Sequence, residues 1–555
     1  MKKLFKQLKK VFFNRKALII EGAIFFIIFI IFTTNTLYVS YPDEFVNLLA
    51  GKFLNQGKLP YKEFFDHHLS FAWHFASLLL RFSFGSFVIF RLLFSTFIFA
   101  CFFALALWIR KNHKGFYRYY LAFFFLYPLI AVYFWFHLYL ADSLAAFFFS
   151  LIFWILMVQT LSKKINIRAI TISSFLTFCL IFSSMTYLYL AIFLYFWQLY
   201  LLFRNKKSIL KYILLSALPY ILYLLYIFLI GAFKDFYFSN FVYNTEYYIS
   251  LPNYTRGRFF NPLKFGLTLI HNFYSGYLPL LTKIKTLDLY LPIGILSGLG
   301  SFVLLILLII RLPILGIIFF FILSFSGPRS NVFETNETDY QSSIFYILGI
   351  ISTIFAFYIL RRVRANDRLI SDLKRIVQVL LVIFFVFTSI FLMKNTYDKF
   401  FMRYTQKMPR IYDLSFTAEF LDKILEEGDY YWAGPYEPHE LFFVKKGRLP
   451  GKYISLLPQF RENEYLKQDF LKQFEDNTPK LIVFKHEASV FNTPSTDFGE
   501  FFLNWIHKRY VSLKDIKDVE VIQSPSSFKL EEDLYILNQE KDNVLKKLKD
   551  NNYIK

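Results

Sequence analysis

Cysteine is scarce in this chain, with 2 residues among 555, Cys101 and Cys179. Both lie inside long apolar runs, so the sequence excludes a fold framed by disulfide bonds and leaves the redox compartment open. Acidic residues are also scarce in the first part of the chain, where residues 1–394 hold 14 Asp or Glu against 38 Lys or Arg. Residues 395–555 hold 26 against 24. The chain has no nucleotide-binding signature, which disfavours a soluble nucleotide-linked substrate.

Hydrophobic residues, by contrast, make up 56% of the chain, and Phe alone contributes 75. Apolar runs recur from residue 17 to residue 394, most of them long enough to cross a hydrocarbon core of about 30 Å as a helix. The sequence therefore predicts a polytopic α-helical membrane protein with about eleven transmembrane helices. The expected spans are residues 17–36, 87–109, 117–136, 141–162, 169–183, 185–203, 209–230, 288–310, 313–326, 343–360 and 376–394.

The basic residues between these runs indicate an orientation. The first run follows MKKLFKQLKK and has no small-residue cleavage site after it, so we expect a retained span rather than a signal peptide. Six basic clusters, including the N-terminus, fall on one side of the expected topology, which we take as cytoplasmic. An integral plasma-membrane protein with a cytoplasmic N-terminus is predicted. Because the basic excess lies in the membrane part, it suits anionic lipids and not nucleic acid.

The chain is expected to divide into a membrane domain, residues 1–394, and a tail, residues 395–555, on the opposite side from the N-terminus. The tail has the pattern of a small soluble α/β domain. TAEFLDKILEEG predicts an amphipathic helix, YYWAG a buried strand, and FLKQFEDNTPKLIVF a helix, a turn and a strand. It contains no nucleophile triad, phosphate loop or metal-ligand spacing, which favours substrate selection or regulation over chemistry.

The first outer loop, residues 37–86, carries a helical pattern directly after two acidic residues, Asp43 and Glu44. The apolar residues that recur at helical spacing are Phe45, Leu48, Leu49, Phe53 and Leu54. This pattern predicts a helix on the membrane surface. Asp43 and Glu44 are then expected just beyond the outer end of the first span.

A second polar group, Asp66, His67 and His68, comes at the start of another predicted interfacial helix, from Leu69 to about Phe82. Both groups of ionisable side chains are thus expected at the boundary between lipid and water. A reaction on a lipid-linked headgroup requires that depth, because the reactive phosphate lies there.

The order of these features resembles the GT-C superfamily of polyprenol-phosphate-sugar glycosyltransferases, which includes protein O-mannosyltransferases and lipid A aminoarabinose transferases. In that family the first outer loop carries an Asp, often within an Asp-Glu pair, then a G-x-x-P-Y-x-D/E stretch, then an acidic residue beside a basic one. The matching residues are Asp43-Glu44, Gly57-Lys58-Leu59-Pro60-Tyr61, Asp66-His67-His68 and, for a second family acid before the fourth span, Asp142. Many members continue with Pro-Pro-Leu, whereas this chain has Leu69-Ser70-Phe71.

The resemblance covers residues 1–395 in topology, and about 37–75 and 133–145 in motif. It implies an inverting transfer of a sugar from a polyprenyl-phosphate carrier to an acceptor hydroxyl or amine. Such a displacement requires a base on the acceptor side and stabilised negative charge on the phosphate. Asp43 is the expected base, with Glu44 and Asp142 as further catalytic acids. The alternative for Asp43 and Glu44 is a pair favoured by a helix dipole, and for Asp142 an interfacial carboxylate without a catalytic function.

The remaining candidates concern the phosphate side of the reaction. Asp66, His67 and His68 are expected to bind substrate. Asp66 together with an imidazole could also provide ligands for a divalent metal. The alternative is that these three residues are only the solvent-exposed start of a helix. Cations that suit a phosphate are Arg256, Arg258 and Arg329, with Arg329 preferred because it follows a span end directly. Each of these arginines, and Arg91 in the second span, is also compatible with a structural role.

Two other functions fit a multi-span chain: a transporter or flippase, and a polymerase or ligase of lipid-linked glycans. Transporters usually place ionisable residues near the bilayer midplane, whereas here the acids lie at the outer ends of spans. Polymerases and ligases rely on large central outer loops, whereas here the first loop is the informative one. The identities of the sugar and of the acceptor do not follow from the sequence.

Overall fold

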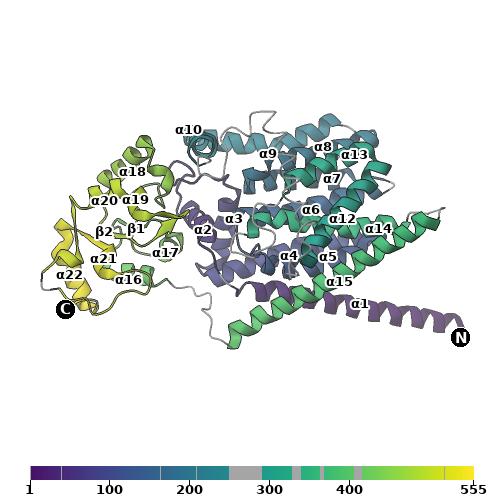
Figure 1. The fold of residues 1–555 in the computed structure, drawn as a ribbon, viewed down its shortest axis with the longest axis horizontal. Coiled ribbons are helices and arrows are strands. Elements are labelled where there is room, and N and C mark those ends of the chain that lie inside the picture. The colour runs from purple at the N-terminus through teal and green to yellow at the C-terminus, as the bar shows by residue number, and fades with distance from the viewer. Residues whose placement is uncertain are drawn as a thin grey trace. The chain divides into compact units, whose positions relative to one another are not determined.

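A computed structural model describes residues 2–38, 40–162, 164–207, 209–248, 291–327, 339–362, 368–405, 415–517 and 519–555. Most of these residues are helical (Figure 1). Within them, seven helices are long and apolar enough to cross a membrane. They are α4 (Phe87–Asn112), α5 (Lys114–Tyr133), α6 (Ala141–Leu161), α8 (Leu188–Arg204), α9 (Ile209–Leu229), α14 (Ser343–Arg362) and α15 (Arg368–Thr405).

Four further helices are apolar over shorter described stretches: α1 (Lys2–Asn35), α7 (Ile167–Ser183), α12 (Leu291–Arg311) and α13 (Pro313–Phe325). All of these helices coincide with runs that the hydropathy pattern marked as spans. The prediction of a polytopic helical membrane protein is therefore confirmed. The number of crossings, eleven, stays a prediction, as do the orientation of the termini and the plasma membrane as location.

The chain forms two compact units, and each combines segments that are distant in sequence. The first comprises the described parts of residues 1–40, 88–220 and 262–411; the second comprises those of residues 41–87, 221–261 and 412–555. The expected division into a membrane domain and a tail at residue 394 stays a prediction. The first loop, residues 37–86, thus belongs almost entirely to the same compact unit as the C-terminal residues.

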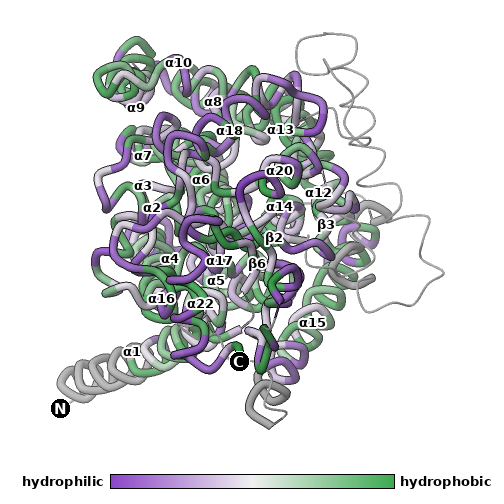
Figure 2. Tube along the Cα trace, turned by 90° about the vertical axis from the view of Figure 1, so that its left-hand side faces the viewer, coloured by the Kyte–Doolittle hydropathy of each residue, from purple (hydrophilic) through white to green (hydrophobic). Residues whose placement is uncertain are grey.

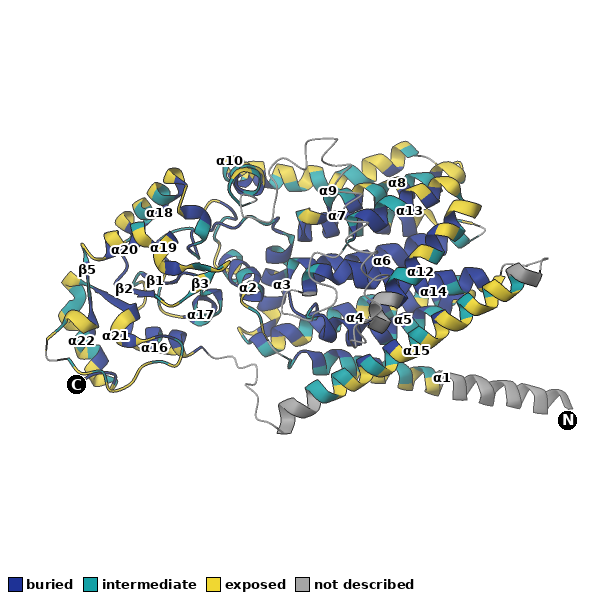
Figure 3. Ribbon diagram, viewed as in Figure 1, coloured by how far each residue is buried: buried dark blue, intermediate teal, exposed yellow. Residues whose placement is uncertain are grey.

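In the first unit, α6 and α14 are buried along nearly their whole length, whereas α15 exposes most of its apolar side chains (Figure 3). Apolar residues run along α4 and α15, while α18 (Glu464–Asp476) in the second unit is largely polar (Figure 2). Exposed apolar side chains on a helix of this length are compatible with lipid contact and not with water. The burial pattern therefore distinguishes core helices from lipid-facing ones.

Helices α12 and α14 approach each other closely because small residues face one another along their contact. Thr353 Oγ1 donates a hydrogen bond of 2.9 Å to the Leu296 carbonyl oxygen across this contact. Gly349 lies against Ser297, and Gly300 lies against Thr353. Small residues at helix contacts allow the backbones to approach in a membrane, where van der Waals packing and hydrogen bonds drive association.

We expect Gly349→Val to destabilise the first unit by about 2–3 kcal/mol or more, because overpacking forces backbones apart. A Cβ atom at Gly349 would lie 2.6 Å from Ser297 Cα, closer than atoms can approach. Gly22→Val in α1 is the control, because no atom of the described residues lies within 4 Å of a Cβ placed there. Thermal unfolding of both purified variants in detergent measures the difference, and equal melting temperatures would contradict this packing.

The second unit contains a four-stranded sheet in the order β1-β2-β6-β5. Its strands are β1 (Tyr431–Gly434), β2 (Leu481–Phe484), β5 (Tyr510–Ser512) and β6 (Leu534–Leu537), with a separate hairpin β3 (Ser489–Val490) and β4 (Thr493–Pro494). Strands β1 and β2 are parallel, and the other pairs are antiparallel. LIVF in β2 is buried throughout, as an apolar run without alternation requires of a central strand.

Short helices surround this sheet: α16 (Phe416–Ile424), α17 (Pro438–Phe443), α18, α19 (Ser495–Phe498), α20 (Glu500–Ile506), α21 (Leu530–Asp533) and α22 (Lys541–Asp550). Ser415 and Asn463 cap α16 and α18, because each side chain accepts a hydrogen bond from a backbone N–H in the first turn. The helix, strand, and helix-turn-strand predicted from the three tail motifs are α16, β1, and α18 with β2, and all three predictions are confirmed.

The rest of the second unit comes from earlier in the chain. It includes α2 (Pro42–Asn55), α3 (Phe71–Ser83), α10 (Phe233–Tyr237) and a π-helix, Phe238–Tyr247. Helix α2 contacts both α3 and α17 (Figure 1). The apolar face expected on the membrane surface is thus covered by protein: Phe45, Leu48, Leu49 and Phe53 are all buried. Packing against these two helices removes the apolar side chains from water, which stabilises the contact.

Candidate functional site

Asp43 and Glu44 lie in the first turn of α2. Tyr41 precedes the helix in an extended conformation and Pro42 occupies its first position, where a missing N–H costs nothing. Acidic residues there are stabilised by the positive end of the helix dipole, so a structural role explains their presence in part. Their environments differ: Glu44 is fully buried, whereas Asp43 is half-buried. Of the two, Asp43 is the more exposed carboxylate.

The C-terminal part of the unit contacts Asp43 directly. The hydroxyl of Tyr436 donates a hydrogen bond of 2.7 Å to Asp43 Oδ1. Tyr436 belongs to the segment PYEPHELFF, which follows β1 and was given no residue-level role from the sequence. A contact between residues 393 positions apart has no local sequence signal, so sequence reasoning missed it.

Lys52, near the end of α2, forms further hydrogen bonds between α2 and the C-terminal residues. Its Nζ donates to the carbonyl oxygens of Phe442 at 2.7 Å and Val444 at 2.8 Å. These carbonyls lie at the C-terminal end of α17, where a cation complements the helix dipole. Burial lowers the pKa of Lys52 to about 8, against the opposing influence of Asp422.

Asp66, His67 and His68 form a compact cluster, as the sequence suggested. One ligand atom from each lies within 4.8 Å of the others. Asp66 is buried, and its Oδ1 accepts a hydrogen bond from the His67 backbone N–H at 2.6 Å and lies 2.8 Å from His68 Nδ1. Its second oxygen, Oδ2, is buried and has no hydrogen-bond partner among the residues that the structure describes. A buried carboxylate oxygen without a partner is costly unless a ligand binds it.

The ionisation of this cluster suits ligand binding. Burial opposes ionisation of Asp66, but the neighbouring His68 and His67 outweigh it and hold the pKa of Asp66 below its usual value. Burial also lowers the pKa of His67 to about 3, with His68 adding to the effect and Asp66 opposing it. A neutral imidazole retains a lone pair, which is the form that coordinates a metal.

The donor set of this cluster fits a divalent cation. One carboxylate and two imidazoles are ligands that zinc and related metals accept, and three protein ligands leave a coordination position open for substrate. The orphaned Oδ2 of Asp66 is the observation in favour of a bound cation. Because the other oxygen already contacts both histidines, a metal there would have its carboxylate ligand oriented in advance.

Residues from the 221–261 segment support the histidines. Asn244 Nδ2 donates to the His67 carbonyl oxygen at 2.9 Å, and the Tyr248 ring lies over the His67 ring with centroids 4.3 Å apart. Tyr61 OH donates to the His68 carbonyl oxygen at 3.1 Å. Tyr61 is the tyrosine of the G-x-x-P-Y stretch, so this motif residue orients the cluster. Asn244 and Tyr248 carried no recognisable sequence signal.

Asp142 lies in the first turn of α6, within the first unit, and is buried. Its carbonyl oxygen accepts a hydrogen bond from Ser343 Oγ at 3.2 Å, which ties α6 to the start of α14. Because Asp43 belongs to the second unit, the expected cooperation between the two acids stays a prediction.

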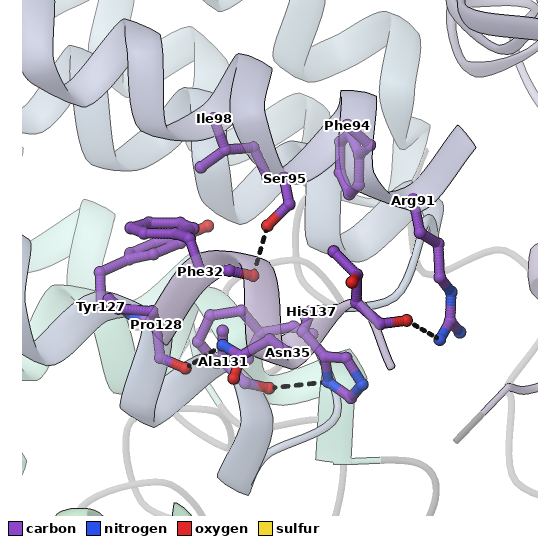
Figure 4. A pocket seen from close by; sticks show the side chains of 12 residues that line it. Phe32, Asn35, Arg91, Phe94, Ser95, Ile98, Tyr127, Pro128, Ala131 and His137 are labelled. Atoms are coloured by element: carbon purple, nitrogen blue, oxygen red, sulfur yellow. Dashed lines mark hydrogen bonds between the residues drawn. The ribbon is translucent and has the colours of Figure 1, made fainter. Parts of the chain in front are cut away.

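A small pocket in the first unit surrounds the end of α1 (Figure 4). Its polar lining residues are Asn35, Thr36, Arg91, Ser95 and His137. The sequence is compatible with a structural role for Arg91 in which its guanidinium reaches the membrane surface. In the structure the Arg91 side chain is buried. Its guanidinium donates to the carbonyl oxygens of Thr36 at 3.3 Å and Tyr38 at 2.6 Å. A cation at the carboxyl end of a helix satisfies carbonyls that lack helical partners. Arg91 thus fixes the end of α1.

The three arginines expected to contact phosphate, Arg256, Arg258 and Arg329, lie outside the described residues. Their roles therefore stay predictions. Comparison of the chain with models of known protein families finds no match, and comparison with curated proteins finds none either. The resemblance noted in the sequence thus depends on the motif residues themselves.

Proposed function

We propose that this membrane-embedded protein is an inverting glycosyltransferase. In this proposal it moves a sugar from a polyprenyl-phosphate carrier to a protein, lipid or glycan acceptor on the outer face of the membrane. The distribution of basic loops supports a cytoplasmic N-terminus, which would place the first loop and the C-terminal residues outside. The sugar and the acceptor are not specified by any residue described above.

The observation that carries the proposal is the arrangement of acids in the second unit. Asp43 is half-buried at a helix N-terminus, and Asp66 with its two histidines forms a separate buried cluster with an unsatisfied oxygen. Both are needed for an inverting displacement, which requires a proton acceptor and an electrophilic partner for the departing phosphate. Both also come from the first loop, which directly follows the membrane helix α1.

The reaction assigns a step to each group. The acceptor oxygen or nitrogen attacks the anomeric carbon while its proton passes to Asp43, and the bond to the carrier phosphate breaks with its electron pair on the phosphate oxygen. Glu44, fully buried beside Asp43 in the first turn of α2, is the second acid of this group. Asp66, His67 and His68 would hold a divalent cation; such an ion, when bound, supplies Lewis-acid stabilisation to the phosphate.

Donor turnover by the purified protein tests this function. The detergent-solubilised chain is incubated with a set of fluorescent polyprenyl-phosphate sugars, and free polyprenyl phosphate is measured with and without candidate acceptors. Release of polyprenyl phosphate supports a transferase. The same protein in sealed liposomes serves as a second arm, in which movement of the intact donor across the bilayer without turnover would instead establish a transporter or flippase.

A further inference from the structure

The hydroxyl group of Tyr436, in the C-terminal part of the chain, contacts Asp43 of the first loop. Its 2.7 Å hydrogen bond to Asp43 Oδ1 has the ordinary length of a bond between a hydroxyl donor and an oxygen acceptor. Tyrosine hydroxyls donate readily to carboxylates and, unlike Lys or Arg, add no charge. Such a partner orients a carboxylate without neutralising it.

The backbone around Tyr436 is held from both sides. Pro435 follows β1 directly, and its carbonyl oxygen accepts a hydrogen bond of 2.8 Å from the Leu456 N–H. On the other side, Glu437 Oε1 lies 2.7 Å from Nζ of Lys485, the residue that follows β2. Because β1 and β2 are neighbouring parallel strands, Tyr436 projects from a position that the sheet determines.

The helix after Tyr436 is packed on the helix that carries Asp43. The Phe45 ring lies 4.5 Å from the His439 ring and 5.8 Å from the Phe442 ring, centroid to centroid, and Phe45 is 1% exposed. With the two hydrogen bonds from Lys52, these contacts fix α17 on α2 along the length of α2. The bond between Tyr436 and Asp43 is thus one end of an extensive contact and not an isolated surface pair.

A second connection joins the same C-terminal residues to the histidine cluster. The Phe65 backbone N–H donates to the Lys452 carbonyl oxygen at 2.7 Å, and the Phe65 ring lies 5.3 Å from the Tyr453 ring. Phe65 immediately precedes Asp66. The segment from Tyr436 to Tyr453 therefore touches the chain at Asp43 and next to Asp66, at both groups of acids.

We propose that Tyr436 is a positioning residue for the proton-accepting carboxylate of Asp43, so that the C-terminal domain completes the active site. This inference depends on the proposed transferase function. The hydrogen bond holds the Asp43 side chain in one orientation and favours its ionised form, which is the form that accepts a proton. The C-terminal residues, expected from the sequence to select substrates or regulate, would then also contribute directly to the geometry of catalysis.

The test compares Tyr436→Phe with the unaltered protein in the donor-turnover assay. The phenyl ring remains, so the variant is expected to fold with α17 in place. Loss of the hydroxyl should lower kcat by about 10- to 100-fold with little change in KM, as removal of an orienting partner does. The acid limb of the pH–rate profile should also move to higher pH, because a carboxylate that loses a hydrogen bond is protonated more readily.

Tyr510→Phe is the matched control. The Tyr510 hydroxyl donates a buried hydrogen bond of 2.7 Å to the Pro479 carbonyl oxygen, at the far strand β5 of the same sheet. Both variants lose one hydroxyl from the same domain, and their melting temperatures should be similar. We expect Tyr510→Phe to retain the kcat and the pH profile of the unaltered protein.

The possible outcomes separate the two proposals. If the unaltered protein turns over its donor and Tyr436→Phe has an unchanged or higher kcat with an unmoved acid limb, the positioning role is wrong while the transferase function stands. A higher kcat would indicate instead that the hydroxyl blocks the site. If the unaltered protein turns over none of the donors, the proposed function fails, and the role of Tyr436 fails with it.

Discussion

Replacing Asp43 with Asn is expected to reduce sugar transfer by at least about 1,000-fold. The amide keeps the size of the carboxylate and can still accept the hydrogen bond from Tyr436, but it cannot take a proton from the acceptor. General base catalysis alone contributes about 100- to 10,000-fold, and loss of the charge adds to that. The rate of polyprenyl-phosphate release per mole of purified protein is the measurement, with donor binding followed separately.

Glu464→Gln provides the control for this prediction. Glu464 is an exposed carboxylate in α18, outside the motifs of the first loop, and its Oε1 accepts a local hydrogen bond of 2.6 Å from Lys467 Nζ. The same chemical change there should leave transfer within about 2-fold, since exposed surface groups away from the site contribute little. Full activity of Asp43→Asn, at normal protein level and melting temperature, would remove Asp43 from the mechanism.

Loss of the Asp66 carboxylate is expected to have the second largest effect. Asp66→Asn should lower transfer by about 100- to 1,000-fold and should remove a bound divalent metal. Elemental analysis of the purified protein is the direct measurement. We expect near-stoichiometric metal in the unaltered protein and a several-fold lower content in the variant. A chelator should inhibit the unaltered protein, and added Zn²⁺ or Mn²⁺ should restore its activity.

Asp533→Asn is the matched control for the metal. Asp533 is also a buried aspartate next to a histidine, with Oδ1 lying 3.3 Å from His486 Nδ1, but it is not part of a three-ligand group in the described chain. This variant should retain its metal and its activity. If the unaltered protein contains no metal above background and a chelator has no effect, Asp66 and the two histidines bind substrate by charge and hydrogen bonding alone.

Hydropathy and local periodicity were sufficient to predict the positions of most helices and of two strands. The apolar runs marked the positions of the long helices, because a lipid-exposed helix has to be apolar along its whole length. In the C-terminal residues, LIVF and YWAG identified buried strands. Gly57, with φ of +84°, lies just after α2, where the sequence placed the break.

The candidate site was predictable only in part. Asp43, Glu44 and the group from Asp66 to His68 stand in short motifs, so the sequence could single them out. Their partners are remote: Tyr436 is 393 positions from Asp43, and Asn244 is 177 positions from His67. Nothing local distinguishes these side chains, because their importance arises only when the chain folds.

The same reasoning applies to α2, whose position on the membrane surface stays a prediction. Its spacing of apolar residues correctly predicted an amphipathic helix. Amphipathicity, however, indicates only that one face of the helix must be shielded from water. A membrane surface and a protein partner satisfy that need equally well in the sequence pattern. The structure assigns the cover to α3, from the same loop, and to α17, from almost four hundred residues later.

The dependence of α2 on α17 has a consequence for synthesis of the protein. The ribosome completes Lys52 long before Phe442, the residue 390 positions later that contacts it. At about 5–20 residues per second, that interval lasts roughly 20–80 s. For this time the apolar side of α2 lacks one of the two helices that contact it, so we expect lipid or a chaperone to shield the nascent loop until α17 has been synthesised.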